Sequence, residues 1–301
     1  MDIKSVNFVE VGPRDGFQNV KEYIPLEKKL HIIDMLIQSG VKSMELTSFV
    51  HPKAIPQMKD SHDVVIKTLE KHGSSDVDFF ALVPNLFGAK AAAECGLTKI
   101  DTVISVSESH NKANINRTVS ESLEGLTAIR QELPDMEIIL SLATAFTCPF
   151  EGITPIDNVL SIIRKGVDLG IHQFCLADTI GQADPLMVRN TAKAVLKEFP
   201  NEHFELHIHD TRGMGLVSTL AGIEAGINSV QAAVGGLGGC PFAPGASGNV
   251  ASEDLIFMLN AMNIHTGIDF QKMLDTALYE TTIISGNYSG HQIHVNTPCS
   301  N

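Results

Sequence analysis

Two histidines, His207 and His209, lie two residues apart in an otherwise apolar segment of the chain. If this segment is a strand, residues i and i+2 point to the same face, so both imidazoles can face one interior. Adjacent imidazoles avoid mutual repulsion only when they stay neutral, and a bound divalent metal keeps them neutral. The alternatives are two hydrogen-bonded polar residues stacked inside the protein, or an alternation that faces outward. The pair favours a metal site without requiring one.

Two oxygen-bearing residues strengthen the metal interpretation. Asp15 follows the first strand-like segment and Asn249 follows the last, so closure of the strands into a barrel would bring both beside the histidines. Two imidazoles with oxygen donors and open positions suit Mg²⁺ or Mn²⁺, with Zn²⁺, Fe²⁺ and Co²⁺ as alternatives. These residues therefore predict a divalent metal, with Mg²⁺ or Mn²⁺ first.

A fixed positive charge stands next to this candidate site. Arg14 lies in the short stiff run Gly12-Pro13-Arg14-Asp15-Gly16, and its forked donors suit an enolate or carboxylate oxygen. The alternative is an ordinary surface ion pair. Glu45 lies inside an apolar strand, where a carboxylate is costly unless paired, and Arg14 on the neighbouring strand is its natural partner. Glu45 is then a structural ion pair, an orienting residue for catalysis, or both.

Two further features are candidates for chemistry. Asp178 ends a strand-like segment and could take a proton or hold a base, although a helix N-cap is an alternative role for it. The run Gly235–Gly239 predicts a mobile loop over the mouth of the site, with a phosphate-binding nest as the competing interpretation. Cys240 follows that run and could be a proton donor, a nucleophile or a bystander. A metal beside a cation under such a loop suits aldol or Claisen-type carbon–carbon cleavage.

One repeating pattern supplies the elements that must position these residues. Short β-branched runs alternate with amphipathic helical segments at spacings of about 30 residues, which predicts parallel strands with helical crossovers. Eight such units, without G-x-G-x-x-G after the first strand, favour a TIM (β/α)8 barrel over an open doubly wound sheet. We expect the barrel to span 1–266 and a helix with an irregular tail to occupy 267–301. In a TIM barrel the active site lies at the carboxyl ends of the strands, where all the candidates above fall.

The expected strands are Val6–Val11, Val41–Thr47, Asp78–Val83, Lys99–Ser105, Met136–Ala143, His172–Ala177, His203–His209 and Ser229–Val234. The expected helices are Leu26–Ser39, Ser61–His72, Leu86–Glu94, Val119–Leu133, Pro155–Leu169, Pro185–Phe199, Leu216–Ala225, Ser252–Met262 and Phe270–Thr282.

Composition narrows the class of protein. Acidic residues outnumber basic ones by 35 to 22, a net charge of −13, which disfavours nucleic acid and anionic membranes as partners. No apolar run is as long as the roughly 18 residues that a membrane-spanning helix needs. The five cysteines lack paired spacing, which indicates free thiols, and we take Cys95, Cys148, Cys175 and Cys299 as structural. We expect a cytoplasmic protein.

At these same positions the chain resembles the 3-hydroxy-3-methylglutaryl-CoA lyase family of the DRE-TIM metallolyase superfamily, from about Val9 to Asp269. The motifs occur in order at the expected barrel positions, which makes the resemblance highly specific. They are Val11-Gly12-Pro13-Arg14-Asp15-Gly16, Glu45-Leu46-Thr47-Ser48-Phe49-Val50, Ser109-His110-Asn111, Asp178-Thr179-Ile180-Gly181, His207-Ile208-His209-Asp210-Thr211, and Gly235-Gly236-Leu237-Gly238-Gly239-Cys240-Pro241 with Gly248-Asn249.

The resemblance implies a role for each candidate. It implies that Asp15, His207, His209 and Asn249 bind the metal. It implies that Arg14 stabilises an enolate and that Cys240 takes part in proton transfer. Glu45, Asp178 and His207 are expected to orient the metal ligands or move protons, and Gln18 and Thr179 to bind substrate with Arg14. The implied substrate is an acyl-CoA thioester, the implied reaction releases acetyl-CoA and acetoacetate, and a homodimer is expected.

Several positions depart from the family pattern: Phe17, Thr147, Ala177 and Arg212-Gly213-Met214. None removes an expected metal ligand, but they lie close enough to the mouth to leave the acyl group open. The alternatives are a lyase for a related branched substrate such as citramalyl-CoA, a Claisen-condensing synthase of the isopropylmalate or homocitrate type, and a binding or scaffold barrel. The synthases usually carry a long C-terminal extension for which these 301 residues leave no room, so we expect a lyase.

Overall fold

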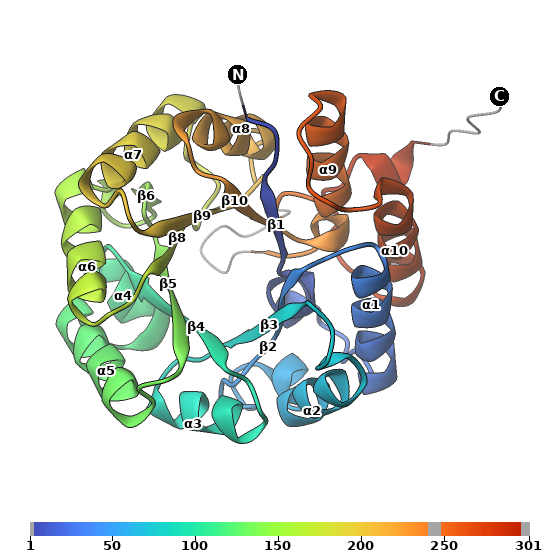
Figure 1. Ribbon diagram of the computed structural model, residues 1–301, viewed down its shortest axis with the longest axis horizontal. Helices are drawn as coiled ribbons and strands as arrows, with labels where there is room; N and C mark the ends of the chain where they lie inside the picture. Colours follow the sequence, from blue (N-terminus) through green and yellow to red (C-terminus); the bar gives the residue numbers. More distant parts are fainter. Residues whose placement is uncertain (1–2, 240–247, 296–301) are drawn as a thin grey trace.

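The computed structural model, which describes residues 3–239 and 248–295, is a closed barrel of eight parallel strands surrounded by helices (Figure 1). Around the barrel the strands run in the order β1-β10-β9-β8-β5-β4-β3-β2, and β1 pairs with both β2 and β10. The predicted TIM barrel is therefore confirmed. None of the helices in the described ranges is both long and apolar enough to cross a membrane.

The barrel strands agree closely with the sequence-based expectation. They are β1 (Asn7–Glu10), β2 (Ser43–Ser48), β3 (Asp78–Leu82), β4 (Lys99–Ser105), β5 (Glu137–Ala143), β8 (Gln173–Asp178), β9 (His203–Ile208) and β10 (Ser229–Ala232). A small antiparallel hairpin of β6 (Thr147–Cys148) and β7 (Gly152–Ile153) follows β5 and was not expected.

The expected helices are also present, with boundaries shifted by a residue or so. They are α1 (Leu26–Gln38), α2 (Ser61–His72), α3 (Leu86–Glu94), α5 (Val119–Glu132), α6 (Ile156–Asp168), α7 (Pro185–Glu198), α8 (Gly215–Ala225), α9 (Ser252–Ala261) and α10 (Phe270–Ile283). Helix α4 (Glu108–Ile115) was missed, because it carries little apolar periodicity and buries only the polar His110 and Asn111. Its start is a side-chain cap, in which the Ser107 hydroxyl accepts the backbone N–H of His110 at 3.1 Å.

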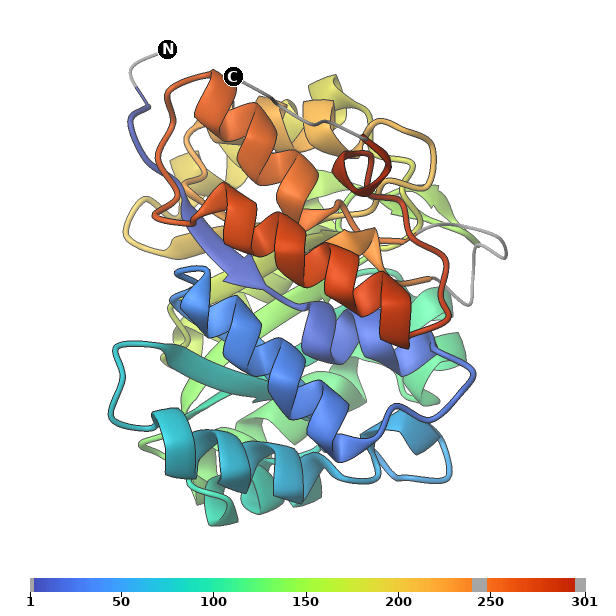
Figure 2. The same cartoon turned by 90° about the vertical axis from the view of Figure 1, so that its right-hand side faces the viewer.

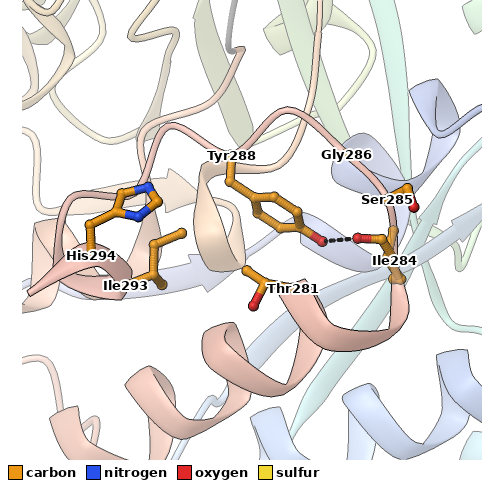
Figure 3. A pocket seen from close by; sticks show the side chains of 7 residues that line it. All are labelled: Thr281, Ile284, Ser285, Gly286, Tyr288, Ile293 and His294. Carbon is orange, nitrogen blue, oxygen red and sulfur yellow. Dashed lines mark hydrogen bonds between the residues drawn. The ribbon is translucent and has the colours of Figure 1, made fainter. Parts of the chain in front are cut away.

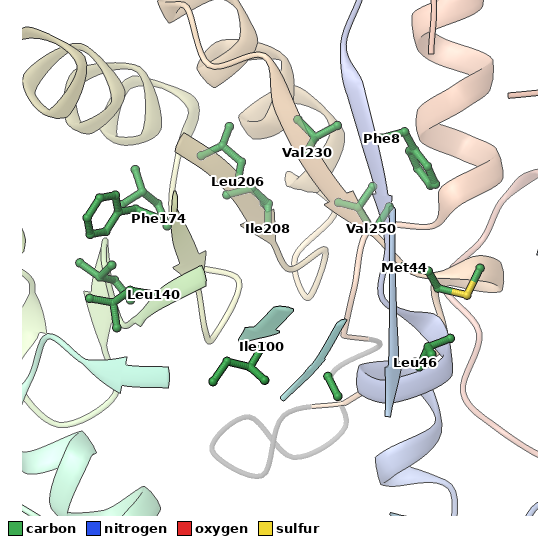
Figure 4. Close-up of a cluster of buried hydrophobic side chains, with 14 of the residues drawn as sticks. Phe8, Met44, Leu46, Ile100, Leu140, Phe174, Leu206, Ile208, Val230 and Val250 are labelled. Carbon is green, nitrogen blue, oxygen red and sulfur yellow. The ribbon is translucent and has the colours of Figure 1, made fainter. Parts of the chain in front are cut away.

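Alternation along each strand divides the buried side chains into two sets. On β9, Phe204, Leu206 and Ile208 belong to the large apolar core between barrel and helices, part of which Figure 4 shows. The intervening residues of β9, Glu205 and His207, therefore face the barrel interior. The strand thus uses its apolar face for stability and its polar face for the site.

The segment after residue 266 is packed into the helical ring. Helix α10 contacts both α1 and α9, and Figure 2 shows it lying between them. The chain then returns to the barrel mouth, where Gly290 N–H donates to Gly235 O at 3.1 Å and Ser289 Oγ donates to Asn249 O at 3.0 Å. The tail is thus bonded to the loops that follow β10.

Helix α10 also buries an unpaired carboxyl group. Glu280 is fully buried, and neither of its oxygens has a hydrogen-bond partner among the described residues. Burial raises the pKa of Glu280 well above its ordinary value of 4.5, and the nearby Glu10 and Glu253 raise it further. The carboxyl of Glu280 therefore keeps its proton in the folded protein.

This protonation predicts a pH-dependent effect of removing the group. In the unfolded chain Glu280 ionises above its ordinary pKa, so the stability it contributes is complete below that value and declines as the pH rises toward the raised pKa. We expect Glu280→Met to raise the free energy of unfolding by about 1–3 kcal/mol at pH 8 and by less at pH 5, measured by urea denaturation. Glu280→Gln replaces the carboxyl group with an amide that cannot titrate. The free energy of unfolding of this variant should lose the pH dependence that Glu280 causes and should otherwise change little. A gain of equal size at both pH values would contradict the prediction.

Candidate metal centre and active site

A one-turn π-helix, η1 (Gly12–Gly16), positions Arg14 and Asp15 at the carboxyl end of β1. The turn starts where the backbone N–H groups of Arg14 and Asp15 both donate to Val11 O, at 3.1 and 2.7 Å. Glycine at position 12 leaves room for this turn, because a Cβ there would lie 2.7 Å from Glu10 Oε1 and 3.2 Å from Val234 N. That same carboxylate oxygen accepts from Gly12 N and Val234 N, which joins this turn to the end of β10.

Asp15, His207 and His209 meet at the barrel mouth, with one ligand atom from each lying within 4.8 Å of the others. The Nε2 atoms of the two histidines are 3.1 Å apart, and Asp15 Oδ2 lies 3.8 Å from His207 Nε2. All three side chains are buried. The sequence-based expectation that they gather at one mouth is confirmed for these three residues.

Asn249 joins the same cluster from the other end of the chain. A backbone bridge pairs it with His209, and its Nδ2 donates to Asp15 Oδ2 at 2.8 Å. Its Oδ1 is buried and has no hydrogen-bond partner among the described residues. An unpartnered amide oxygen beside two facing imidazoles and a carboxylate is a donor set that fits a divalent cation.

The protonation states in the cluster are those that metal binding needs. Burial alone would raise the pKa of Asp15, but Arg14, His207, His209 and the bond from Asn249 lower it to about 2. Burial, and then the neighbouring His207, lower the pKa of His209 to about 4, and burial lowers that of His207. At neutral pH the cluster is therefore a carboxylate with two neutral imidazoles.

Arg14 is held by the two carboxylates on either side of it. Its Nε donates to Glu45 Oε2 at 2.6 Å, and its Nη1 donates to Asp15 Oδ1. The ion pair predicted between Arg14 and Glu45 is thus confirmed. Burial opposes the charge of Arg14, yet Glu45 and Asp15 raise its pKa, so it stays a cation. Gln18 donates to Asp15 Oδ1 at 2.6 Å and so orients this carboxylate.

Glu45, the partner of Arg14 on β2, is itself fully buried. Burial raises its pKa to about 8, with Arg14 opposing the rise and Asp101 adding to it. Its Oε1 is buried and has no partner among the described residues. Glu45 therefore has a free oxygen next to the site and can exchange a proton near neutral pH.

Asp178 and Thr179 support loops at the same rim. The two oxygens of Asp178 accept the backbone N–H groups of Gln182 and Ala183, at 3.1 and 3.0 Å. The alternative role of Asp178 as a helix N-cap is wrong, because Asp184 caps α7. Thr179 Oγ1 accepts the N–H of Thr144 at 2.7 Å.

The first half of the glycine run is packed, which differs from the expected mobile loop. Gly235 and Gly236 adopt φ values of 68° and 64° within the 3-10 turn η4 (Val234–Gly236), and both are buried. This packing is possible because glycine has no side chain: a Cβ on Gly236 would lie 2.0 Å from Ser289 Oγ. Gly235 N also donates to Glu253 Oε2 at 2.9 Å. Cys240 lies outside the described residues.

Sequence reasoning missed the polar side chains beneath the cluster. Gln231 on β10 and Glu205 on β9 are buried and hydrogen-bonded to each other, and Gln231 is also hydrogen-bonded to His207. Because Glu205 and His207 lie two residues apart in an expected strand, their spacing could have indicated that both side chains share one face. The position of Gln231 depends on the register between two strands, which the sequence alone does not show.

A separate pocket of about 310 Å³ lies in the C-terminal segment (Figure 3). It is bounded by the end of α10 and the chain that follows, and Tyr288 Oη donates across it to Ile284 O at 3.0 Å. None of the clustered metal-site residues lines it. The chemistry of the barrel mouth does not extend into this pocket.

Known proteins resemble the chain across nearly its whole length. The family model described as HMGL-like matches residues 5–279. The hydroxymethylglutaryl-CoA lyase of Bacillus subtilis is 40% identical over 276 residues, covering 91% of each chain. The crystal structure of a Bacillus subtilis HMG-CoA lyase superposes with a TM-score of 0.92 at 38% identity, covering 98% of this chain and 99% of that one. An Acinetobacter baumannii HMG-CoA lyase in complex with coenzyme A and 3-methylmalate gives a TM-score of 0.93 at 36% identity, covering 99% and 97%.

From the geometry of the cluster, we expect metal binding to depend on the imidazole of His207. We expect His207→Ala to raise the Mn²⁺ dissociation constant by more than about 100-fold, beyond the range typical of residues outside the ligand shell. Electron paramagnetic resonance of free Mn²⁺ measures this. His172→Ala removes an exposed imidazole before β8, paired with Glu202, and should leave the constant unchanged. Equal Mn²⁺ affinity in both variants would refute the metal centre.

Proposed function

The chain belongs to the HMGL-like family, and on that premise we propose that it is a hydroxymethylglutaryl-CoA lyase, which cleaves 3-hydroxy-3-methylglutaryl-CoA into acetyl-CoA and acetoacetate. The observation that carries the proposal is the buried cluster of Asp15, His207 and His209 beside the Arg14 cation. A binding or scaffold barrel would have no use for this costly arrangement of buried polar groups.

We propose Asp15, His207, His209 and Asn249 as the metal ligands and Mg²⁺ or Mn²⁺ as the metal. The two imidazole nitrogens, the carboxylate and the unpartnered amide oxygen of Asn249 support this assignment. When bound, such a metal supplies Lewis-acid polarisation to the hydroxyl and carboxylate oxygens of the substrate.

The cleavage is a proton transfer coupled to a carbon–carbon bond break. The tertiary hydroxyl loses its proton and its oxygen forms the ketone of acetoacetate. The electron pair of the broken bond moves into the thioester, giving the enolate of acetyl-CoA, which then takes up a proton at carbon. The protein must therefore supply a base, a cation for the enolate oxygen and an acid.

Arg14 is the cation that we assign to the enolate oxygen. Its Nε and Nη1 are used by Glu45 and Asp15, so the guanidinium is held rigidly while Nη2 donates to no side chain in the described ranges. A positive charge fixed in advance stabilises the enolate without reorganisation when the charge appears.

The proton steps are assigned to groups at the same mouth. Glu45 is the best placed of them to hold a proton, because its Oε1 has no described partner and its pKa is raised to about 8 by burial. Asp178 accepts two loop amides, which suits it to positioning that loop. Both ring nitrogens of His207 are engaged, Nδ1 by Gln231 and Nε2 by His209, which suits His207 to a ligand role more than to the base. We assign protonation of the enolate to Cys240 by family resemblance.

The substrate is proposed to be an acyl-CoA thioester contacted by Arg14, Gln18 and Thr179. The coenzyme A in the Acinetobacter baumannii relative supports this substrate class. We further propose that the protein acts as a cytoplasmic homodimer, whose mass in solution light scattering measures directly.

A substrate panel tests the proposed function. We expect the Mn²⁺-loaded protein to release acetyl-CoA from 3-hydroxy-3-methylglutaryl-CoA at a kcat/KM at least about tenfold above that for citramalyl-CoA, the difference that one well-used polar contact provides. Acetyl-CoA release is followed by coupled assay or mass spectrometry. Preference for citramalyl-CoA would transfer the assignment to that substrate, and no release from any ester would defeat it.

From the role assigned to Arg14, we expect its replacement to slow the chemical step without weakening substrate binding. Arg14→Met should lower kcat by about 10²–10⁴ with a much smaller change in KM, because the enolate charge exists only along the reaction path. Arg164→Met removes a surface guanidinium paired with Glu198 and should leave both constants unchanged. A change in KM alone would contradict the role of Arg14.

A further inference from the structure

A chain of buried hydrogen bonds leads from His207 away from the metal cluster. His207 Nδ1 lies 3.0 Å from Gln231 Oε1, and Gln231 Nε2 donates to Glu205 Oε2 at 2.8 Å. All three residues are buried. The other carboxylate oxygen of Glu205 lies 3.5 Å from His203 Nε2, toward the opposite end of β9.

Strand register builds this chain. Glu205 and His207 share the inner face of β9, and the parallel pairing of β10 with β9 places Gln231 directly beside His207. The amide of Gln231 is therefore within reach of both the imidazole next to it and the carboxylate two residues earlier. No loop takes part, so the arrangement is as rigid as the barrel wall.

The chemistry of the three groups sets the direction of every bond. Glu205 Oε2 accepts the hydrogen bond from Gln231 Nε2, so the NH₂ group of Gln231 faces Glu205. The carbonyl oxygen of Gln231 must then face His207, and an oxygen there requires the proton on Nδ1. The remaining nitrogen of His207, Nε2, keeps its lone pair and points at His209 Nε2, 3.1 Å away.

We propose that Gln231 and Glu205 are positioning residues that hold His207 in the Nδ1–H tautomer. In this tautomer Nε2 carries no proton, and its lone pair can bind the metal. The proposal rests on the proposed metal centre and assigns a role to two residues outside it. Gln231 acts directly on the imidazole, and Glu205 acts only by orienting the Gln231 amide. A merely structural role, in which the amide satisfies buried polar groups, would affect folding but not metal affinity.

Removing the amide tests the first half of the proposal. Gln231→Met should raise the Mn²⁺ dissociation constant by about 10–100-fold, the usual effect of losing a partner of a metal-binding histidine. At saturating Mn²⁺ most of the kcat should return, with KM for the acyl-CoA little changed. In metal-stripped protein, ¹⁵N spectra of labelled histidine, assigned with His207→Ala, should show His207 leaving the Nδ1–H tautomer.

A matched control separates this effect from lost stability. Gln57→Met makes the same exchange at another buried amide, which bonds the backbone of Val20, Glu22 and Ile24 and does not contact the cluster. It should lower the melting temperature while the Mn²⁺ affinity stays within twofold of the unmodified protein. A Gln231→Met protein with unchanged Mn²⁺ affinity and an unchanged tautomer would overturn the proposal.

A double substitution tests the role of Glu205. Glu205→Gln allows the neighbouring amide to turn either way, so Mn²⁺ affinity should fall, by less than in Gln231→Met. In a Gln231→Met background the same change should have no further effect, because Glu205 then has nothing to orient. Additive losses would show that Glu205 acts independently and would overturn that half of the proposal.

The failure of this inference is distinguishable from failure of the metal centre. If the unmodified protein binds Mn²⁺ no better than His207→Ala, the metal centre itself is wrong and this inference falls with it. If the unmodified protein binds Mn²⁺ tightly and Gln231→Met binds it equally well, the centre stands and only the positioning role is refuted.

Discussion

Two neutral imidazole nitrogens facing each other at 3.1 Å, with a carboxylate oxygen 3.8 Å from one of them, are the constraint on which the rest of the site depends. At this distance a proton or a cation must lie between the two nitrogens, because facing lone pairs in a buried place would be costly. The barrel keeps the nitrogens this close because His207, His209 and Asp15 are held by strands and a tight turn rather than by loose loops. Pre-positioned ligands of this kind lose little entropy when a metal binds.

The charges around the cluster are divided so that each group can keep its role. Arg14 lowers the pKa of Asp15 and is itself fixed by Asp15 and Glu45, so one cation serves both the ligand and the reaction. Burial raises the pKa of Glu45 while the carboxylate of Asp15 stays ionised. Environments that push two neighbouring carboxyl groups apart in pKa are typical of sites that both bind a cation and move a proton.

Local patterns in the sequence predicted most of the fold and the centre of the site. Regular alternation of β-branched runs and amphipathic helices located all eight barrel strands, and the ends of those strands brought His207, His209 and Asp15 together. The pairing of Arg14 with Glu45 followed from the cost of an unpaired buried carboxylate. Helix α4 lacked a period to detect, and the packing of Gly235 depends on Tyr288, more than fifty residues away. The Gln231–Glu205 link depends on inter-strand register, which no single segment encodes.

The bonds from Ser289 and Gly290 to Asn249 and Gly235 have a consequence for biosynthesis. Asp15 precedes Ser289, which secures Asn249, by more than 270 residues, so a ribosome makes Asp15 long before it makes that segment. Closure of the barrel between β1 and β10 has the same late timing, because more than two hundred residues separate these strands. A nascent chain can therefore form most of its strand–helix units before β10 and the segment around Ser289 are made, whereas the contacts that hold Asn249 beside Asp15 can form only afterwards.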